Sequence, residues 1–217
     1  MHLLSVPCAP GALKDTAMGR NKQVSDEDVL KAAQDVFVER GFGASTREIA
    51  RRAGISEAVL YQRHRTKLDL FFAAMIPPPI ELAGVSDARR DQGVFAELEA
   101  LAVEIMKYFR EAMPVLLQLV THPSFNLAEL ADRGTRMPLH RLGEAVAACL
   151  ERHRGQGTIT ADSDRVQAAA LTLLATLHSL ALFERMGVHG GSFPDLAVKN
   201  IVGLIAAGLA PEKGDEP

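Results

Sequence analysis

Apolar residues recur along most of the chain at intervals of three and four, which is the spacing of one face of an α-helix. In the first such stretch, Val29, Ala33, Val36 and Phe37 form one apolar stripe and predict a helix over 26–40. The pattern predicts further helices over 46–52, 57–64, 67 to the prolines at 77–79, 93–112, 114–121, 124–132, 138–154, 163–186 and 193–209. Aromatic residues are scarce, at 5%, and we expect an all-α fold.

Several polar residues mark where these helices begin and end. Ser45 and Glu48 match a capping box at the start of the second helix, and Thr66 with Asp69 repeats that pattern at the fourth. Ser56 is a suitable N-cap for the third helix. The run Pro77–Pro79 lacks backbone N–H groups and cannot continue a regular helix, so the fourth helix must stop or kink there.

The second and third helices have the features of a helix-turn-helix over residues 45–64. Ala50 is small enough for the two helices to meet closely, and Gly54 suits a turn that needs positive φ. Ile55 and Leu60 anchor the second helix of the pair, so that its opposite face stays exposed for a DNA groove. The alternative is an ordinary helical hairpin.

The distribution of charge supports the helix-turn-helix. The whole chain carries a net charge of −3, which points weakly away from nucleic acid. Residues 40–67, however, hold seven basic and two acidic side chains, whereas residues 70–217 hold thirteen basic and eighteen acidic ones. This asymmetry favours an anionic partner at the first segment, although a solvated basic face would look the same.

Other classes are disfavoured by composition and by missing motifs. The chain has 47% hydrophobic and 24% charged residues, typical of a globular protein. Two cysteines, Cys8 and Cys149, indicate a reducing cytoplasm and no disulfide framework. Cys149 and His153 lie four apart, but two ligands do not make a metal site, so we expect no metal and no cofactor. We find neither an enzyme motif, nor a convincing signal peptide, nor an uninterrupted membrane-spanning run.

Residues 41–71 resemble the DNA-binding region of the TetR family of transcriptional regulators; they read GFGASTREIARRAGISEAVLYQRHRTKLDLF. The family pattern is filled here by Gly41-Phe42, Thr46, Ile49-Ala50, Ala53-Gly54-Ile55-Ser56, Leu60-Tyr61, Lys67 and Leu70. The chain departs from the pattern where Arg63 and His64 replace a His and a Phe. His64 shares a helical face with Leu60, so we expect it to point inward as a neutral, hydrogen-bonded histidine.

Each candidate DNA contact has a role set by its chemistry. We expect Thr46, Tyr61, Arg63 and Lys67 to bind phosphates, which fixes the register of the protein on the duplex. We expect a second group of residues to read bases. Arg47 suits guanine and Glu57 suits cytosine, whereas Ala58 could contact the methyl group of thymine and Gln62 suits adenine. For Glu57 and Gln62, a plain surface position is an equally good interpretation.

The resemblance implies a second helical domain that dimerises and binds a small-molecule effector. The helices over 163–186 and 193–209 are apolar nearly all round, which predicts a homodimer interface at Leu171, Leu174, Leu182, Val198, Ile201, Val202 and Ile205. Residues suited to a ligand pocket are Met75, Met106, Phe109, Met113, Phe125, Met137, His178 and Phe183, although such residues are more often plain core.

These observations predict four regions: a disordered arm (1–20), a helix-turn-helix DNA-binding domain (21–68), a helical regulatory and dimerisation domain (69–210) and a tail (211–217). The sequence leaves open whether Met1 or Met18 is the first residue. The leading hypothesis is a ligand-responsive repressor that binds a pseudo-palindromic operator on double-stranded DNA as a homodimer. The alternative is a helical small-molecule-binding protein with a vestigial helix-turn-helix. In neither case do we expect a membrane partner.

Overall fold

The computed structural model describes residues 24–126, 128, 139–188 and 190–209, and this part of the chain is helical, without strands. Its helices are α1 (Asp26–Arg40), α2 (Thr46–Ala53), α3 (Glu57–Arg63), α4 (Lys67–Ala74), α5 (Ala83–Asp87), the 3-10 helix η1 (Arg90–Gln92), α6 (Val94–Val120), α8 (Leu139–Gly155), α9 (Ser163–Met186) and α10 (Asp195–Leu209). The all-α prediction is confirmed. The expected arm and tail, Met137 and most of the helix expected over 124–132 lie outside the described residues.

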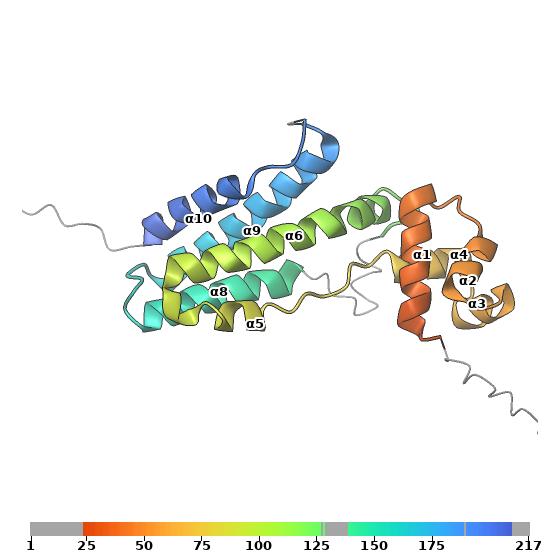
Figure 1. Cartoon of the computed structure of the whole chain (residues 1–217), viewed down its shortest axis with the longest axis horizontal. Helices are drawn as coiled ribbons and strands as arrows, with labels where there is room; N and C mark the ends of the chain where they lie inside the picture. Colours follow the sequence, from red (N-terminus) through yellow and green to blue (C-terminus); the bar gives the residue numbers. More distant parts are fainter. Residues whose placement is uncertain (1–23, 127, 129–138, 189, 210–217) are drawn as a thin grey trace, which may run out of the picture.

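The helices gather at two ends of an elongated molecule (Figure 1). Helices α1 to α4 form a small domain at one end, and α6, α8, α9 and α10 form a bundle at the other. The long α6 runs from the bundle to α1, where its last turns join the core of the small domain through Val115 and Leu119. The small domain is therefore built on the end of α6.

The helix caps predicted for the small domain are present in the structure, with one exception. The Ser56 hydroxyl accepts from the Val59 amide, and Thr66 and Asp69 form the predicted capping box. Ser45 makes no side-chain cap, so the capping box expected there is wrong. The physical reason is that the Glu48 carboxylate is occupied elsewhere: it pairs with Arg40 at 2.6 Å and Arg52 at 3.4 Å.

The segment after α4 is extended, as the proline run requires. Helix α4 ends at Ala74, and Pro77–Pro79 lie outside any helix. The chain then forms α5 and η1, two short helices that hydrophobic periodicity did not predict. Leu70, Phe71 and Ala74 pack α4 into the core of the small domain, so the extended segment connects that domain to α5 in the bundle (Figure 1).

Two helices expected over 93–112 and 114–121 are instead one, α6, of 27 residues. Pro114 lies inside it without ending it. Burial on both sides of the proline explains the continuity: Met113 and Val115 are both buried, one in the core of the bundle and one in that of the small domain.

Helix α9 has the predicted bounds and is also long and apolar enough, by length and composition, to cross a membrane. In this fold it packs against α6, α8 and α10, with Val166, Leu173 and Leu177 in the core of the bundle. Leu171 and Met186 on the same helix remain about two-thirds exposed, at 66% and 65%. Exposed apolar side chains that gather on a helix are typical of a protein–protein contact.

Candidate nucleic-acid interface

The turn between α2 and α3 has the geometry of a helix-turn-helix. Gly54 takes a left-handed conformation, with φ 71° and ψ 28°, where a side chain would be strained. The Ile55 amide donates to the Ala50 carbonyl at 3.0 Å, which closes the turn. Ile49, Ala50 and Leu60 are buried, so the opposite face of α3 remains accessible.

That accessible face carries three of the four side chains expected to read bases, together with Tyr61, which we expect to bind phosphate. Arg47 on α2 and Ala58, Tyr61 and Gln62 on α3 are exposed. Their spacing on α3, with Ala58, Tyr61 and Gln62 at i, i+3 and i+4, places them on one side of the helix. A short helix held at its other side by Leu60 can present these groups to a groove.

Thr46, Glu57 and Tyr61 form a hydrogen-bonded group across the two helices. The Thr46 hydroxyl donates to the Glu57 carboxylate at 2.5 Å, and the Tyr61 hydroxyl donates to Thr46 Oγ1 at 3.3 Å. Two hydroxyls predicted to bind phosphates are thereby held next to a carboxylate. Glu57 orients them in this structure, a role that the sequence alone did not indicate.

Two of the basic residues predicted to bind phosphates are already engaged within the protein. Arg63 pairs with Asp26 at 2.9 Å and donates to the Val24 carbonyl at 2.9 Å, which ties the end of α3 to the start of α1. The Lys67 ammonium lies 4.8 Å from the centre of the Phe42 ring. Lys67 is half-buried beside α3, whereas Arg63 would have to leave its partners to reach DNA.

His64 points inward, as predicted, but it is not hydrogen-bonded as expected. Its Nε2 is buried and has no hydrogen-bond partner among the described residues. Burial lowers the pKa of His64, with smaller opposing effects from Asp26 and Asp69, so the neutral form is favoured. Replacing the usual Phe by His at this position therefore leaves a polar atom unsatisfied in a small core.

The comparison with known proteins identifies the small domain. Residues 29–74, which run from α1 to the end of α4, match the family described as bacterial regulatory proteins, tetR family. The small domain is therefore a TetR-type DNA-binding region. This family consists of regulatory proteins rather than enzymes, in agreement with the absence of an enzyme motif from the sequence.

Among curated proteins, this chain is 50% identical over 48 residues to the HTH-type transcriptional activator FasR of Mycolicibacterium smegmatis. The match covers 22% of this chain and 22% of FasR, so the chain shares only about a fifth of the length of this relative. Two solved structures share the whole fold. A protein of unknown function from Rhodococcus sp. RHA1 has a TM-score of 0.61 at 20% identity, over 91% of this chain and 100% of its own. The regulator FadR of Bacillus subtilis, in complex with stearoyl-CoA, has a TM-score of 0.58 at 15% identity, over 85% and 99%.

The residues expected to line a ligand pocket do not gather in one place. Met75 lies in the core of the small domain, while Met106, Phe109 and Met113 are buried in the bundle. The rings of Phe109 and His178 form a T-shaped contact, with 5.3 Å between their centroids. Burial lowers the pKa of His178. Phe125 packs on the small domain, and Phe183 is 40% exposed. Four of the eight residues are therefore buried in the two hydrophobic cores, and their role in a ligand pocket stays a prediction.

The residues expected at the dimer interface divide in the same way. Leu174, Val198 and Val202 face the interior of the protomer and cannot form an external surface, because their exposed fractions are 9%, 1% and 0%. Leu182, Ile201 and Ile205 are half-buried against that core, and Leu171 is exposed. Leu196 and Leu204 of α10, which are not among the residues expected at the interface, are more exposed, at 62% and 77%.

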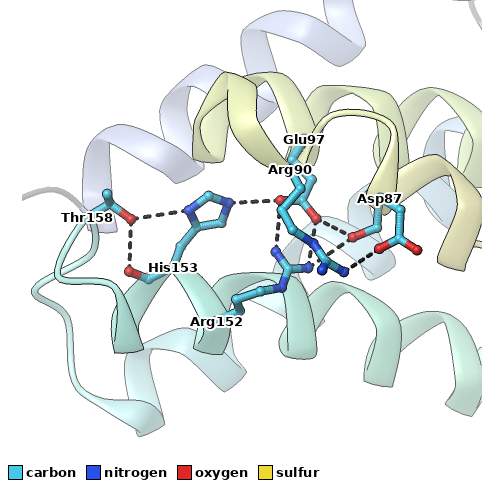
Figure 2. A network of polar contacts seen from close by, with 7 residues as sticks. Asp87, Arg90, Glu97, Arg152, His153 and Thr158 are labelled. Atoms are coloured by element: carbon cyan, nitrogen blue, oxygen red, sulfur yellow. Dashed lines mark hydrogen bonds and ion pairs between the residues drawn. The ribbon is translucent and has the colours of Figure 1, made fainter.

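The bundle also contains a buried polar network centred on Glu97, which the sequence did not indicate (Figure 2). Glu97 on α6 is fully buried and accepts from Arg152 on α8 at 2.8 and 2.9 Å. His153 Nε2 lies 2.9 Å from the same carboxylate, and the Ser86 hydroxyl donates to it from α5. The signal available in the sequence was a Glu placed four residues before Leu101, on an apolar face.

The same network brings three metal-binding residue types together, but it already contains a cation. Glu97, Cys149 and His153 offer ligand atoms within 4.8 Å of one another. The Arg152 guanidinium, however, bonds both oxygens of Glu97. Burial raises the pKa of the Cys149 thiol to about 12, so the thiol is protonated. The carboxylate is neutralised by the chain itself, and we assign no metal to this cluster.

Proposed function

We propose that this chain is a DNA-binding transcriptional regulator that acts in the cytoplasm as a homodimer on a pseudo-palindromic operator and represses its target. The observation that carries the proposal is the exposed face of α2 and α3, with Arg47, Tyr61 and Gln62 presented beside a turn fixed by Gly54. The TetR-family match over 29–74 covers this unit.

Two features support a dimer: the small size of one helix-turn-helix and the exposed apolar side chains of the bundle. One helix-turn-helix makes too few base contacts for high specificity, and two-fold dimers that span successive major grooves solve this. Leu196 and Leu204 lie eight residues apart on one face of α10 and are 62% and 77% exposed. Leu171 and Met186 of α9 are also about two-thirds exposed, and we expect a second copy to cover exposed apolar positions of α9 and α10.

Regulation by a small molecule is the remaining part of the proposal. FadR of Bacillus subtilis, which shares the fold, was solved in complex with stearoyl-CoA, and we infer that this chain likewise responds to a small-molecule effector. A ligand that binds two conformations of the bundle unequally would shift the fraction of dimers whose reading helices match the operator.

The first experiment measures binding to the DNA upstream of the protein's own gene at several salt concentrations. We expect tight binding that weakens steeply with salt and exceeds binding to random duplex. Arg47→Ala should weaken the free energy of operator binding by about 1–3 kcal/mol if Arg47 contacts guanine. The matched control is Arg89→Ala, an exposed arginine in the bundle, which should bind like the wild type. Equal, salt-insensitive binding to both duplexes would refute the proposal and favour a vestigial helix-turn-helix.

A second experiment addresses the dimer and the direction of regulation. Leu204→Glu places a charge on the apolar face of α10 and should convert the dimer to a monomer in analytical ultracentrifugation, with loss of operator binding. Val103→Glu, on an exposed position of α6, is the control. A reporter driven by the bound promoter should rise when the protein is removed; a fall would make it an activator, as FasR is named.

A further inference from the structure

An aromatic cluster joins the end of α6 to the small domain. His122 lies two residues beyond the end of α6, and its ring contacts three phenylalanine rings. The centroid distances are 4.6 Å to Phe42, 4.9 Å to Phe71 and 5.6 Å to Phe72. The contacts with Phe42 and Phe72 are T-shaped, a favourable arrangement for aromatic pairs. Phe71 and Phe72 belong to α4, whereas Phe42 lies between α1 and α2, so one ring from the bundle side contacts two parts of the small domain.

Hydrogen bonds at the end of α6 fix the position of the His122 ring. The Ser124 amide donates to His122 Nδ1 at 3.1 Å, which closes a turn in the way that an Asn or Asp side chain does. Gln118 Nε2 donates to the Val38 carbonyl of α1 at 3.1 Å, and Leu119 is buried in the core of the small domain. The ring is therefore held in a set position relative to α1 and α4.

Phe42 connects this cluster to a cation that we expect to bind DNA. Lys67 Nζ lies 4.8 Å from the centroid of the Phe42 ring, within the range of a cation–π contact. Lys67 forms no ion pair within the described part of the chain, so its charge remains available to a phosphate. Phe42 itself is 36% exposed, and the closest of its described aromatic neighbours is the His122 ring. A contact that restrains the ammonium beforehand lowers the entropy lost when it binds.

We propose that His122 is a positioning residue for DNA binding. It orients the Phe42 ring, and that ring holds the Lys67 ammonium where α4 begins. His122 lies outside residues 29–74, so it is not part of the matched DNA-binding region. The phosphate contact of the small domain thereby depends on the end of a bundle helix. This inference rests on the proposed DNA-binding function and names a further residue on which that function depends.

Two substitutions separate the ring of His122 from its hydrogen bond. His122→Asn removes the ring but keeps an acceptor for the Ser124 amide, whereas His122→Phe keeps a ring and removes the acceptor. The full-length protein is titrated with the DNA upstream of its own gene at fixed, low salt. We expect His122→Asn to weaken binding about two- to fivefold for each protomer, the size of an exposed cation–π contact, and His122→Phe to stay within about twofold of the wild type.

The reverse order of these two affinities would show that His122 only closes the turn. Equal affinities of His122→Asn and His122→Phe would show that the ring has no effect of its own. Either result overturns the inference.

A double-mutant cycle with Lys67 tests the route of the effect. Lys67→Met removes the charge, and should weaken binding and reduce the steepness of log K against log salt by about 0.9 for each protomer. In the Lys67→Met background, His122→Asn should have no further effect, because the group that His122 positions is gone. Equal weakening by His122→Asn in both backgrounds would show a general packing role and overturn the inference.

Two further variants control for folding and for the loss of a histidine. His122→Leu removes the ring but keeps apolar bulk; it should bind like His122→Asn, and it decides the question if far-UV circular dichroism shows that the polar variant does not fold. His140→Asn, at an exposed histidine of α8, should bind like the wild type.

Random duplex separates this inference from the proposed function, because phosphate contacts read no sequence. A wild type that prefers its operator, with additive effects of His122→Asn and Lys67→Met, overturns the positioning role alone. A wild type that binds both duplexes equally refutes sequence-specific regulation, while the cycle on either duplex still decides the role of His122. Binding to neither duplex overturns both.

Discussion

The pair Glu97–Arg152 gives a sharp prediction about stability. Arg152→Met removes the guanidinium and leaves a carboxylate that is fully buried. Breaking a buried ion pair by removing one partner typically costs about 3–5 kcal/mol. The Arg152 side chain is 26% exposed, and Ser86 and His153 would still reach the carboxylate, so we expect the lower end, about 3 kcal/mol. For a chain of this size, that corresponds to about 6–12 °C in Tm.

The measurement is thermal or urea unfolding followed by far-UV circular dichroism, which suits a helical chain without tryptophan. Protein concentration must be fixed, because a dimer would unfold in a concentration-dependent way. The control Arg154→Met removes a half-exposed arginine two residues away that pairs with Glu151, and should change stability by less than about 0.5 kcal/mol. The double variant Glu97→Met, Arg152→Met should recover most of the loss, because no charge is left buried.

A loss below about 1 kcal/mol in Arg152→Met would refute this reasoning, since the pair would then behave like a surface ion pair. So would a double variant as unstable as the single one. Acid offers an independent check. Burial alone would raise the pKa of Glu97, but bonds from Ser86 and His153 and the charge of Arg152 outweigh it, and the pKa is lowered from 4.5. The stability that Glu97 contributes is present above its unfolded pKa and lost as pH falls through its folded pKa.

Three further predictions concern single positions. His64→Phe should stabilise the small domain by about 1–3 kcal/mol, because it removes the buried, unpartnered Nε2. Since burial lowers the pKa of His64, the wild type should lose stability as pH falls below about 6.5 in urea titrations, and the variant should lose less. Glu57→Gln should tighten DNA binding in a gel-shift assay, severalfold at low salt, by removing a charge beside Thr46; unchanged affinity would place Glu57 away from phosphate. Pro114→Ala restores an N–H inside α6 and should raise stability by up to about 3 kcal/mol in urea, whereas a loss would show that α6 needs its proline.

The parts of the fold that sequence could predict are those determined by local signals. The bounds of α1 and α9 follow from a clear apolar stripe and from neighbouring caps, and the turn at Gly54 follows from its conformational requirement. Helices α5 and η1 carry no such stripe, because short segments packed against α6 need no period of their own. The prediction divided α6 at Pro114 because proline usually ends a helix. Packing of the buried residues on both sides of Pro114 overrides this preference.

The site was predictable to the same extent. The residue types on α2 and α3 indicate DNA, and the TetR pattern places them correctly in one unit. The partners of these residues were not predictable: Arg63 pairs with Asp26, thirty-seven positions earlier, and Glu97 meets Arg152 across two helices. Such contacts depend on how helices pack, which a period of three or four residues does not encode. The same applies to Leu174 and Val202, whose inward orientation is a property of the whole bundle.

Helix α6 has a mechanical consequence. Glu97 lies in the first turn of α6 and Leu119 in its last turn, so this helix connects the polar network of the bundle to the core of the small domain. At 1.5 Å per residue, the two positions are about 33 Å apart along the helix axis. A tilt of about 5° at the Glu97 end displaces the other end by roughly 3 Å, close to the rise of one base pair. In the proposed two-fold dimer, the same tilt in both protomers would move the two copies of α3 in opposite directions. Mutations that alter DNA recognition are therefore to be sought at both ends of α6, and not only on the face that meets the duplex.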